Sequence, residues 1–354
     1  MPVNSTLAYF SDLSFRTAFV IYVIALLFFI AYYIRQKSAV DAKEELGAQQ
    51  KALVSVGADS ADAAPGESTS DVDADGKDNG KNRRRRGEDA PVTQEDVEKR
   101  EKRADTFGTW GEMILYVGIA VHIASVFLRG LSAGRFPWGN MYEYISIFCA
   151  IALAVAAVVL RNREYRVFWP FILTGVLILM FYGGTALYSE SAPVVPALQS
   201  FWFPIHVSTV VIGASIFLIS GFASLLYLIR MGQPMGKEKG IMGAIAKPLP
   251  SAKKLDTVAY RTAIWAFPLF TLGIVLGAIW AEAAWGRFWG WDPKETVSFV
   301  TWILYAGYLH ARATSGWKNQ MAAWINIVAF ATNIFNLFFI NIVVSGLHSY
   351  AGLN

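Results

Sequence analysis

The chain has 354 residues, of which 55% are hydrophobic, and its mean hydropathy is +0.38. Soluble domains are about 45–50% apolar even with glycine counted, so the composition excludes an ordinary soluble protein and predicts an integral membrane protein. The formal net charge is +4, and the charged residues are concentrated in particular loops. It therefore reports loop orientation in the membrane and does not indicate binding to nucleic acid.

The first apolar run, from about Phe15 to Ile34, predicts an uncleaved transmembrane helix within residues 1–35. It exceeds the roughly 7–15 residues of a signal-peptide core, and no basic region precedes it. Positive charges follow it at Arg35 and Lys37, which places the N-terminus outside.

Residues 36–104 are expected to form a disordered, charged linker on the cytoplasmic side, with a short helix near Thr93–Arg103. This segment has too few apolar residues to offset the entropy of ordering. Its basic tetrad, Arg83–Arg86, is interpreted as a solvated charge run, with contact to anionic membrane lipid as the alternative.

Seven further apolar runs lie in the core, residues 105–354, and most approach the roughly 20 residues that cross a bilayer. They cover residues 109–128, 144–160, 168–187, 205–229, 260–279, 297–313 and 321–347. With the first helix they predict an all-α integral membrane protein with about eight transmembrane helices and both termini outside. No internal repeat is evident, which weighs against a transporter built from inverted halves.

Lysine and arginine are concentrated in alternate loops, which is typical of cytoplasmic loops. The positions on the expected inner side are Arg161, Arg163, Arg166, Arg230, Lys237, Lys239, Lys247, Lys253, Lys254, Arg261, Arg312 and Lys318. The opposite loops carry only Arg129, Arg135, Arg287 and Lys294. This bias places the segment 280–296 on the outer face.

The segment 280–296 is the most informative part of the chain, because it holds Trp280, Trp285, Trp289 and Trp291 together with two glycines. A single tryptophan at a membrane boundary is interpreted as an interfacial anchor. Anchoring does not require the glycines, which let a ligand approach the backbone, or Asp292 and the proline after it, which suit a helix start. The set is therefore interpreted as the floor of a site for a flat aromatic ligand.

Four histidines are candidates for function, because ionisable groups within membrane spans are costly. His206 begins the fifth span and His348 ends the eighth, so both lie level with the tryptophans. Two neutral imidazoles there suit the axial positions of a six-coordinate haem. Zinc fits poorly, because it takes three or four protein ligands. His310 lies in the inner third and His122 in the outer third of the membrane, and for each a structural role stays open.

Other chemistry is absent from the sequence. The single cysteine, Cys149, lies in an apolar run and is interpreted as a small buried hydrophobe. There is no phosphate-binding loop, dinucleotide fingerprint or nucleophile elbow. Each span holds at most one histidine, unlike the paired histidines of cytochrome b bundles.

The run W-A-E-A-A-W-G-R-F-W-G-W-D-P-K-E, residues 280–295, resembles the tryptophan-rich WWD domain of haem-handling proteins in cytochrome c maturation. The following residues 302–312, the outer loop 137–143 and the closing residues 346–350 are similar to the CcsA/ResC branch, the system II type. The resemblance extends from about Trp110 to Tyr350 and leaves out the first helix and the charged linker.

The resemblance implies a plasma-membrane subunit of a cytochrome c synthase that presents haem b at the outer face. There the haem is joined to a Cys-x-x-Cys-His segment of apocytochrome c, so the chain is expected to be part of a thioether-forming haem lyase. His206 and His348 match the outer iron ligands, and Trp280, Trp285, Trp289, Trp291 and Asp292 match the haem floor. His310 matches an intramembrane ligand that is completed by a ResB-type partner subunit.

A second interpretation belongs to a different class: a multi-span transport or scaffold protein in which the tryptophans are interfacial anchors. The haem absorbance spectrum of the purified protein distinguishes the two.

Overall fold

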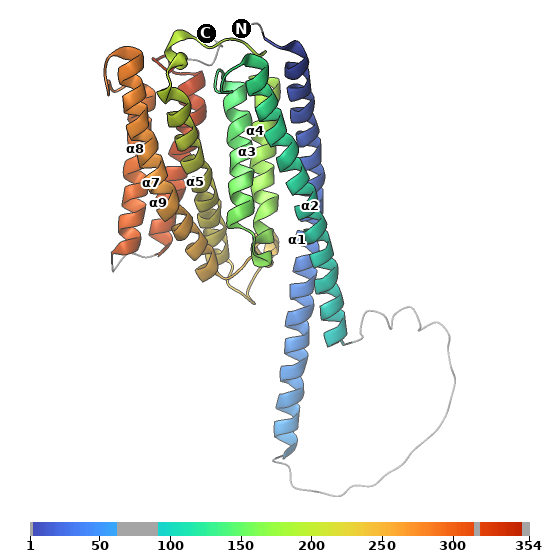
Figure 1. Cartoon of the computed structure of the whole chain (residues 1–354). Helices are drawn as coiled ribbons and strands as arrows, with labels where there is room; N and C mark the ends of the chain where they lie inside the picture. The colour runs from blue at the N-terminus through green and yellow to red at the C-terminus, as the bar shows by residue number, and fades with distance from the viewer. Residues whose placement is uncertain (1–2, 62–90, 315–318, 349–354) are drawn as a thin grey trace, which may run out of the picture.

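The computed structural model describes residues 3–61, 91–314 and 319–348, and within them it contains helices and no strands (Figure 1). The predicted all-α fold is confirmed. The long helices are α1 (Ser5–Ala61), α2 (Gln94–Ala133), α3 (Met141–Val159), α4 (Trp169–Thr185), α5 (Trp202–Gly232), α7 (Ala252–Trp285), α8 (Pro293–Ala313) and α9 (Asn319–Phe335). The short ones are η1 (Arg163–Phe168), η2 (Pro196–Gln199), α6 (Gly240–Ala246) and η3 (Asn336–Ile340).

Each of the eight predicted spans corresponds to one long helix. Seven of these helices are long and apolar enough to cross a membrane, so the protein is a multi-span membrane protein. The eighth, α8, is not among the seven, and it carries Lys294, Glu295, His310 and Arg312. It packs on α7 and α9 and runs beside them along the bundle (Figure 1).

The helices form two groups that meet where α3 packs on α5. One group contains α1–α4 and the other α5 and α7–α9 (Figure 1). We call the end of the bundle that holds the start of α1 and the loops 134–140, 186–201 and 286–292 the upper end. The lower end holds α6 and the long extensions of α1 and α2. The loops rich in lysine and arginine lie at the lower end.

The expectation of disorder over residues 36–104 is wrong for the two flanks of this segment, which are helical. Helix α1 continues unbroken through residue 36 to Ala61, and α2 begins at Gln94, so the helix expected near Thr93–Arg103 is the start of α2. The two extensions lie side by side, and Lys43 forms an ion pair with Glu101 at 3.1 Å. Alanine, lysine and glutamate are good helix formers, and pairing of the two helices adds contacts that one segment alone lacks. Residues 62–90, with the basic tetrad, lie outside the described residues.

The last predicted span is too long. Helix α9 passes into a π-helical turn at Asn336–Ile340, and the chain has left the helix by residue 343. The reason is tertiary, because residues 347 and 348 are bound by Asp292 from another loop. Cys149 is fully buried, as predicted.

Candidate functional site

Two histidines that are far apart in the sequence lie on one indole at the upper end. His206, in the first turns of α5, stacks on Trp280 with a centroid distance of 5.7 Å and an interplanar angle of 15°. His348, beyond α9, contacts the same ring edge-on at 5.5 Å. The Trp280 side chain is 2% exposed, and its Nε1 donates to the Ala197 carbonyl at 3.0 Å. A rigid indole thus brings the two sequence-predicted histidines to one place.

Both imidazoles are oriented through Nδ1. His206 Nδ1 donates to the Gly273 carbonyl at 2.8 Å, and His348 Nδ1 donates to Asp292 Oδ2 at 2.7 Å. A carbonyl and a carboxylate only accept hydrogen bonds, so Nδ1 carries the hydrogen and the lone pair lies on Nε2. A Cβ at Gly277 would lie 2.6 Å from His206 Cε1, so glycine is required for this close approach.

Asp292 joins the tryptophan loop to the segment after α9. It caps α8 in a capping box with Glu295, and its Oδ1 accepts the Leu347 amide at 2.9 Å. Burial raises the pKa of Asp292, but the hydrogen bonds from His348 and Leu347 outweigh it, so the pKa lies below its usual value. Asp292 is therefore charged at neutral pH and positions His348. The sequence indicated its capping role and, through the resemblance, a place in the haem floor, but not its bond to His348.

The imidazole of His348 is held in its neutral form. Burial lowers the pKa of His348 below the ordinary value, against the opposing effect of the Asp292 carboxylate. Only the neutral ring can offer a lone pair to a metal.

Two adjoining hollows flank the pair and share four residues: Tyr144, His206, Lys294 and His348. The first is otherwise lined by Val210, Phe270, Ile274, Gly277, Ala278, Phe288, Trp289, Glu295, Ser298, Asn333, Asn336 and Leu337. The second is otherwise lined by Trp138, Gly139, Asn140, Met141, Leu198, Phe203, Val207, Trp280 and Asn341. An aromatic and aliphatic wall with a few polar groups is typical of a site for an organic cofactor.

The four tryptophans of the segment form two groups. Trp285 lies 4.8 Å from Trp280 and 5.1 Å from His348 between ring centroids. Trp289 and Trp291 contact each other at 5.7 Å, and both lie beside Phe299. Trp289 lines the first hollow, whereas the Trp291 residue is 66% exposed and adopts a positive φ of 58°. The first group lies at the histidines and the second at the rim.

Glu295 holds the loop between these groups in shape. It accepts the amides of Gly290 at 2.8 Å and Asp292 at 3.1 Å, and it pairs with Arg287 at 3.1 Å. A Cβ at Gly290 would lie 2.0 Å from the Arg287 guanidinium. At the second glycine of the segment the Arg287 guanidinium lies close to the backbone, and a larger residue would displace it.

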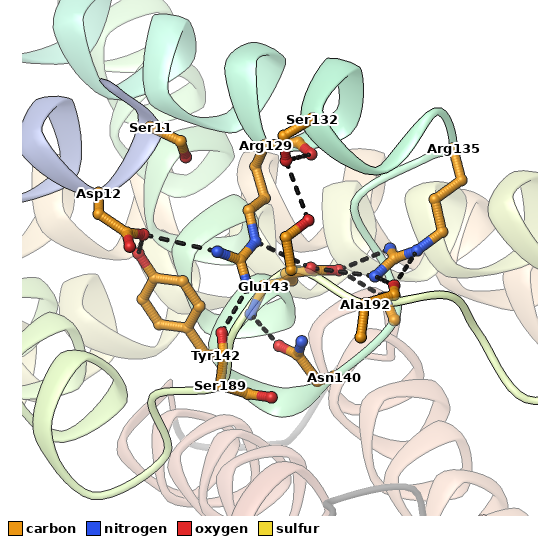
Figure 2. A network of polar contacts seen from close by, with 12 residues as sticks. Ser11, Asp12, Arg129, Ser132, Arg135, Asn140, Tyr142, Glu143, Ser189 and Ala192 are labelled. Atoms are coloured by element: carbon orange, nitrogen blue, oxygen red, sulfur yellow. Dashed lines mark hydrogen bonds and ion pairs between the residues drawn. The ribbon is translucent and has the colours of Figure 1, made fainter. Parts of the chain in front are cut away.

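A buried ion network, which the sequence did not indicate, holds the neighbouring loops (Figure 2). The Glu143 carboxylate accepts from Arg129 Nε at 3.0 Å, from Arg135 at 2.8 Å and from the Gly139 amide at 2.7 Å. Arg129 also reaches Asp12 of α1 and the carbonyl of residue 189. The network ties α1, α2 and α3 to the loops 134–140 and 186–192. Residues 138 and 140 of the first loop line the second hollow.

The two remaining histidines are not part of this site. His122 is completely buried, with Nε2 3.1 Å from Ser146 Oγ and Nδ1 3.3 Å from the Tyr22 hydroxyl. Both of its nitrogens are engaged, so its role is structural. His310 lies near the lower end of α8, and its side chain is exposed on the surface of the bundle.

Residues 138–348, which contain both histidines and the tryptophan segment, match the family model of the cytochrome C assembly protein. The chain belongs to this family. It is 33% identical over 242 residues to a cytochrome c biogenesis protein CcsA of Guillardia theta, a match that covers 64% of this chain and 80% of the relative. The CcsA of Chlamydomonas reinhardtii is 33% identical over 233 residues, with 64% of each chain covered. The CcsA of a Picosynechococcus species is 30% identical over 298 residues, with 69% and 87% covered.

These matches confirm the predicted CcsA-type membership. The chain is a multi-span membrane protein of cytochrome c biogenesis. The family match begins at residue 138, so α1 and α2 lie before it.

Proposed function

We propose that the chain is a subunit of a cytochrome c synthase that holds haem b between His206 and His348 and presents it to apocytochrome c. One observation carries the proposal: two imidazoles share the Trp280 ring, both are hydrogen-bonded through Nδ1, and both line the same hollows. Each Nε2 lone pair is thereby available for an iron at the centre of a flat ligand.

The donor set suits haem better than a bare metal ion. A haem brings four nitrogens of its own and needs only two axial ligands, for which neutral imidazole is a standard group. A zinc site needs three or four protein ligands, and in residues 3–61, 91–314 and 319–348 no group of three histidine, cysteine or acidic side chains is arranged to hold a metal ion. Trp280 and Trp289, which line the hollows, would contact the porphyrin face and edge, and Trp285 packs behind them on Trp280 and His348.

The bound haem supplies vinyl groups to which the two thiols of a Cys-x-x-Cys-His segment can add. In each addition an S–H bond and a C=C π bond break and a C–S and a C–H bond form, so no external oxidant is needed. His206 and His348 hold the iron, and the histidine of the acceptor segment then replaces one of them. Thioether formation is proposed to need a partner subunit.

His310 is proposed to serve a second, intramembrane iron position. Its imidazole is exposed on α8, away from the upper hollows. One exposed imidazole supplies one axial ligand, so the other is proposed to come from a ResB-like membrane subunit that docks on α8. We further propose that the protein lies in the plasma membrane, surrounded by lipid, with its upper end outside. The arginine and lysine bias of the loops supports this orientation.

The alternative, a transport or scaffold protein with tryptophan anchors, is favoured by the exposure of Phe288 and Trp291, at 61% and 66%. Such residues are common at the membrane interface. A haem titration of the purified full-length chain decides between the two functions.

We expect the apoprotein to take up haem with a low-spin bis-imidazole spectrum. His206→Ala and His348→Ala should each abolish this spectrum, and added imidazole should partly restore it by filling the vacated position. His310→Ala is the control and should keep the spectrum when haem is added directly. A normal spectrum in both single variants would refute the proposed ligands, and no haem uptake by the wild type would favour the anchor interpretation.

A further inference from the structure

One charged residue of the upper site has no counter-ion in its immediate contacts. Lys294 lines both hollows next to His206 and His348. In the part of the chain that the structure describes, no carboxylate oxygen lies within 4.0 Å of its ammonium nitrogen in an ion pair. Lys294 is half-buried. An unpaired charge that is partly removed from water is costly, so such a group indicates a ligand of opposite charge.

The neighbouring carboxylates are engaged elsewhere. Asp292 directs its two oxygens to the Leu347 amide and to His348 Nδ1. Glu295 accepts from Arg287 and from two backbone amides of its own loop. Both acids therefore shape the loop and the histidine, and in the described residues neither forms an ion pair with Lys294.

Lys294 is nevertheless held in place. Its Nζ donates to Asn341 Oδ1 at 2.5 Å, and Asn341 Nδ2 donates in turn to the Leu337 carbonyl at 2.6 Å. The second bond fixes the orientation of the amide, so its oxygen faces the ammonium. An ammonium has three N–H donors, and one bond to a neutral amide leaves two for a ligand that enters the hollows.

We propose that Lys294 is the carboxylate-binding residue of this site and pairs with a propionate of the tetrapyrrole. The inference rests on the proposed haem function and adds the orientation of the ring. The two propionates of haem b lie on the edge opposite the two vinyl groups. Lys294 lies in the first turn of α8 and contacts Asn341. With a propionate bound at Lys294, the vinyl edge of the ring points away from Lys294 and toward the acceptor.

The test compares two ligands that differ only in charge at the propionates: haem and haem dimethyl ester. Soret titrations of the purified full-length chain give the Kd of each. A hydrogen bond to a charged group contributes enough that Lys294→Gln should weaken haem binding by roughly 10-fold to 100-fold. Binding of the dimethyl ester should stay within about two-fold, because the ester cannot form the ion pair. Lys294→Arg should retain most of the haem affinity.

Lys254→Gln is the matched control, since Lys254 pairs with Glu164 at the lower end. It should leave both Kd values unchanged. Equal losses for haem and its ester in Lys294→Gln would show that Lys294 acts by supporting the fold, and an unchanged haem Kd would also overturn the inference. A wild type that takes up neither ligand would refute the haem site itself. A wild type with normal uptake and a Lys294 variant without the ligand difference would refute this inference alone.

Discussion

Each imidazole of the upper site donates a hydrogen bond from Nδ1 and leaves the Nε2 lone pair free. The hydrogen-bond acceptor determines which nitrogen carries the hydrogen. His206 donates to the carbonyl of Gly273, which lies in helix α7, 67 positions after His206 in the chain. His348 uses a carboxylate that lies 56 positions away. Partners of this kind set the ring orientation and basicity of a metal ligand. If the pair ligates iron as proposed, its function depends on residues that never touch the metal.

Asp292→Asn tests this dependence. Leu347 and His348 are bound by different oxygens of Asp292. In asparagine one of these two positions holds an NH2 group, which cannot accept a hydrogen bond. We expect a loss of about 10-fold to 100-fold in haem affinity, the range typical for loss of such a partner, while the haem that still binds keeps a bis-imidazole spectrum. Asp41→Asn, which removes an ion-pair partner of Lys247 at the lower end, is the control. Equal affinities in the two variants would contradict the positioning role.

The pH dependence of haem binding follows from His348. Its pKa lies below the ordinary value of 6.5, mainly because of burial. The unfolded chain therefore binds this proton more readily, so the contribution to stability is complete above 6.5 and is lost as the pH falls through the lowered pKa. Because the protonated ring cannot ligate iron, haem occupancy should be constant from about pH 8 to 6.5 and decline only below it. An acid titration of the Soret band checks this, and a decline centred above 6.5 would contradict it.

At the scale of elements, the contact of α1 with α2 depends on a seam of glycines. Gly108, Gly111 and Gly118 lie on the face of α2 that receives Tyr32, Phe29 and Tyr22 of α1. Small residues let two helices approach closely in a membrane, where packing replaces the hydrophobic effect as the driving force. The seam extends the same interface that holds the lower-end extensions side by side.

Gly118→Ala should weaken this interface. A Cβ there would lie 2.7 Å from Tyr22 Cε1 and 3.0 Å from Ile21 Cγ2. We expect a loss of about 1–3 kcal/mol from overpacking, although alanine is the better helix former by about 1 kcal/mol. Gly307→Ala in α8, where nothing lies within 4 Å of the added carbon, is the control and should be neutral or stabilising. Thermal unfolding in detergent measures both, and equal melting temperatures would contradict the seam.

For the whole molecule, orientation in the membrane is the remaining prediction. The native Cys149 is 0% exposed, so a membrane-impermeant thiol reagent reports only introduced cysteines. Phe288→Cys at the upper end, at a residue that is 61% exposed, should be labelled in intact cells. Ile241→Cys at the lower end, at a residue that is 82% exposed, should be labelled only after permeabilisation. The reverse pattern would refute the orientation from loop charge.

Much of the fold could be predicted from the sequence, because a bilayer demands long apolar runs whatever the rest of the chain does. Eight such runs became eight long helices, and the level of His206 and His348 followed from counting along them. The flanks of the linker were missed because helices α1 and α2 support each other there, through contacts such as Arg100 with Ser38. The end of α9 was missed because Asp292, from a distant loop, binds Leu347 and His348, and the chain leaves the helix to reach it.

The sequence by itself determined the class of the protein and the family, and it indicated that His206 and His348 lie at one level, because hydropathy, loop charge and the tryptophan motif are local properties. Only the tertiary structure decided which nitrogen of each imidazole is open, that Trp280 lies at both rings, and that Lys294 lies in the site with no ion-pair partner among the residues that the structure describes. These features depend on hydrogen bonds and contacts between residues that lie far apart along the chain. Their geometry exists only when the helices have packed.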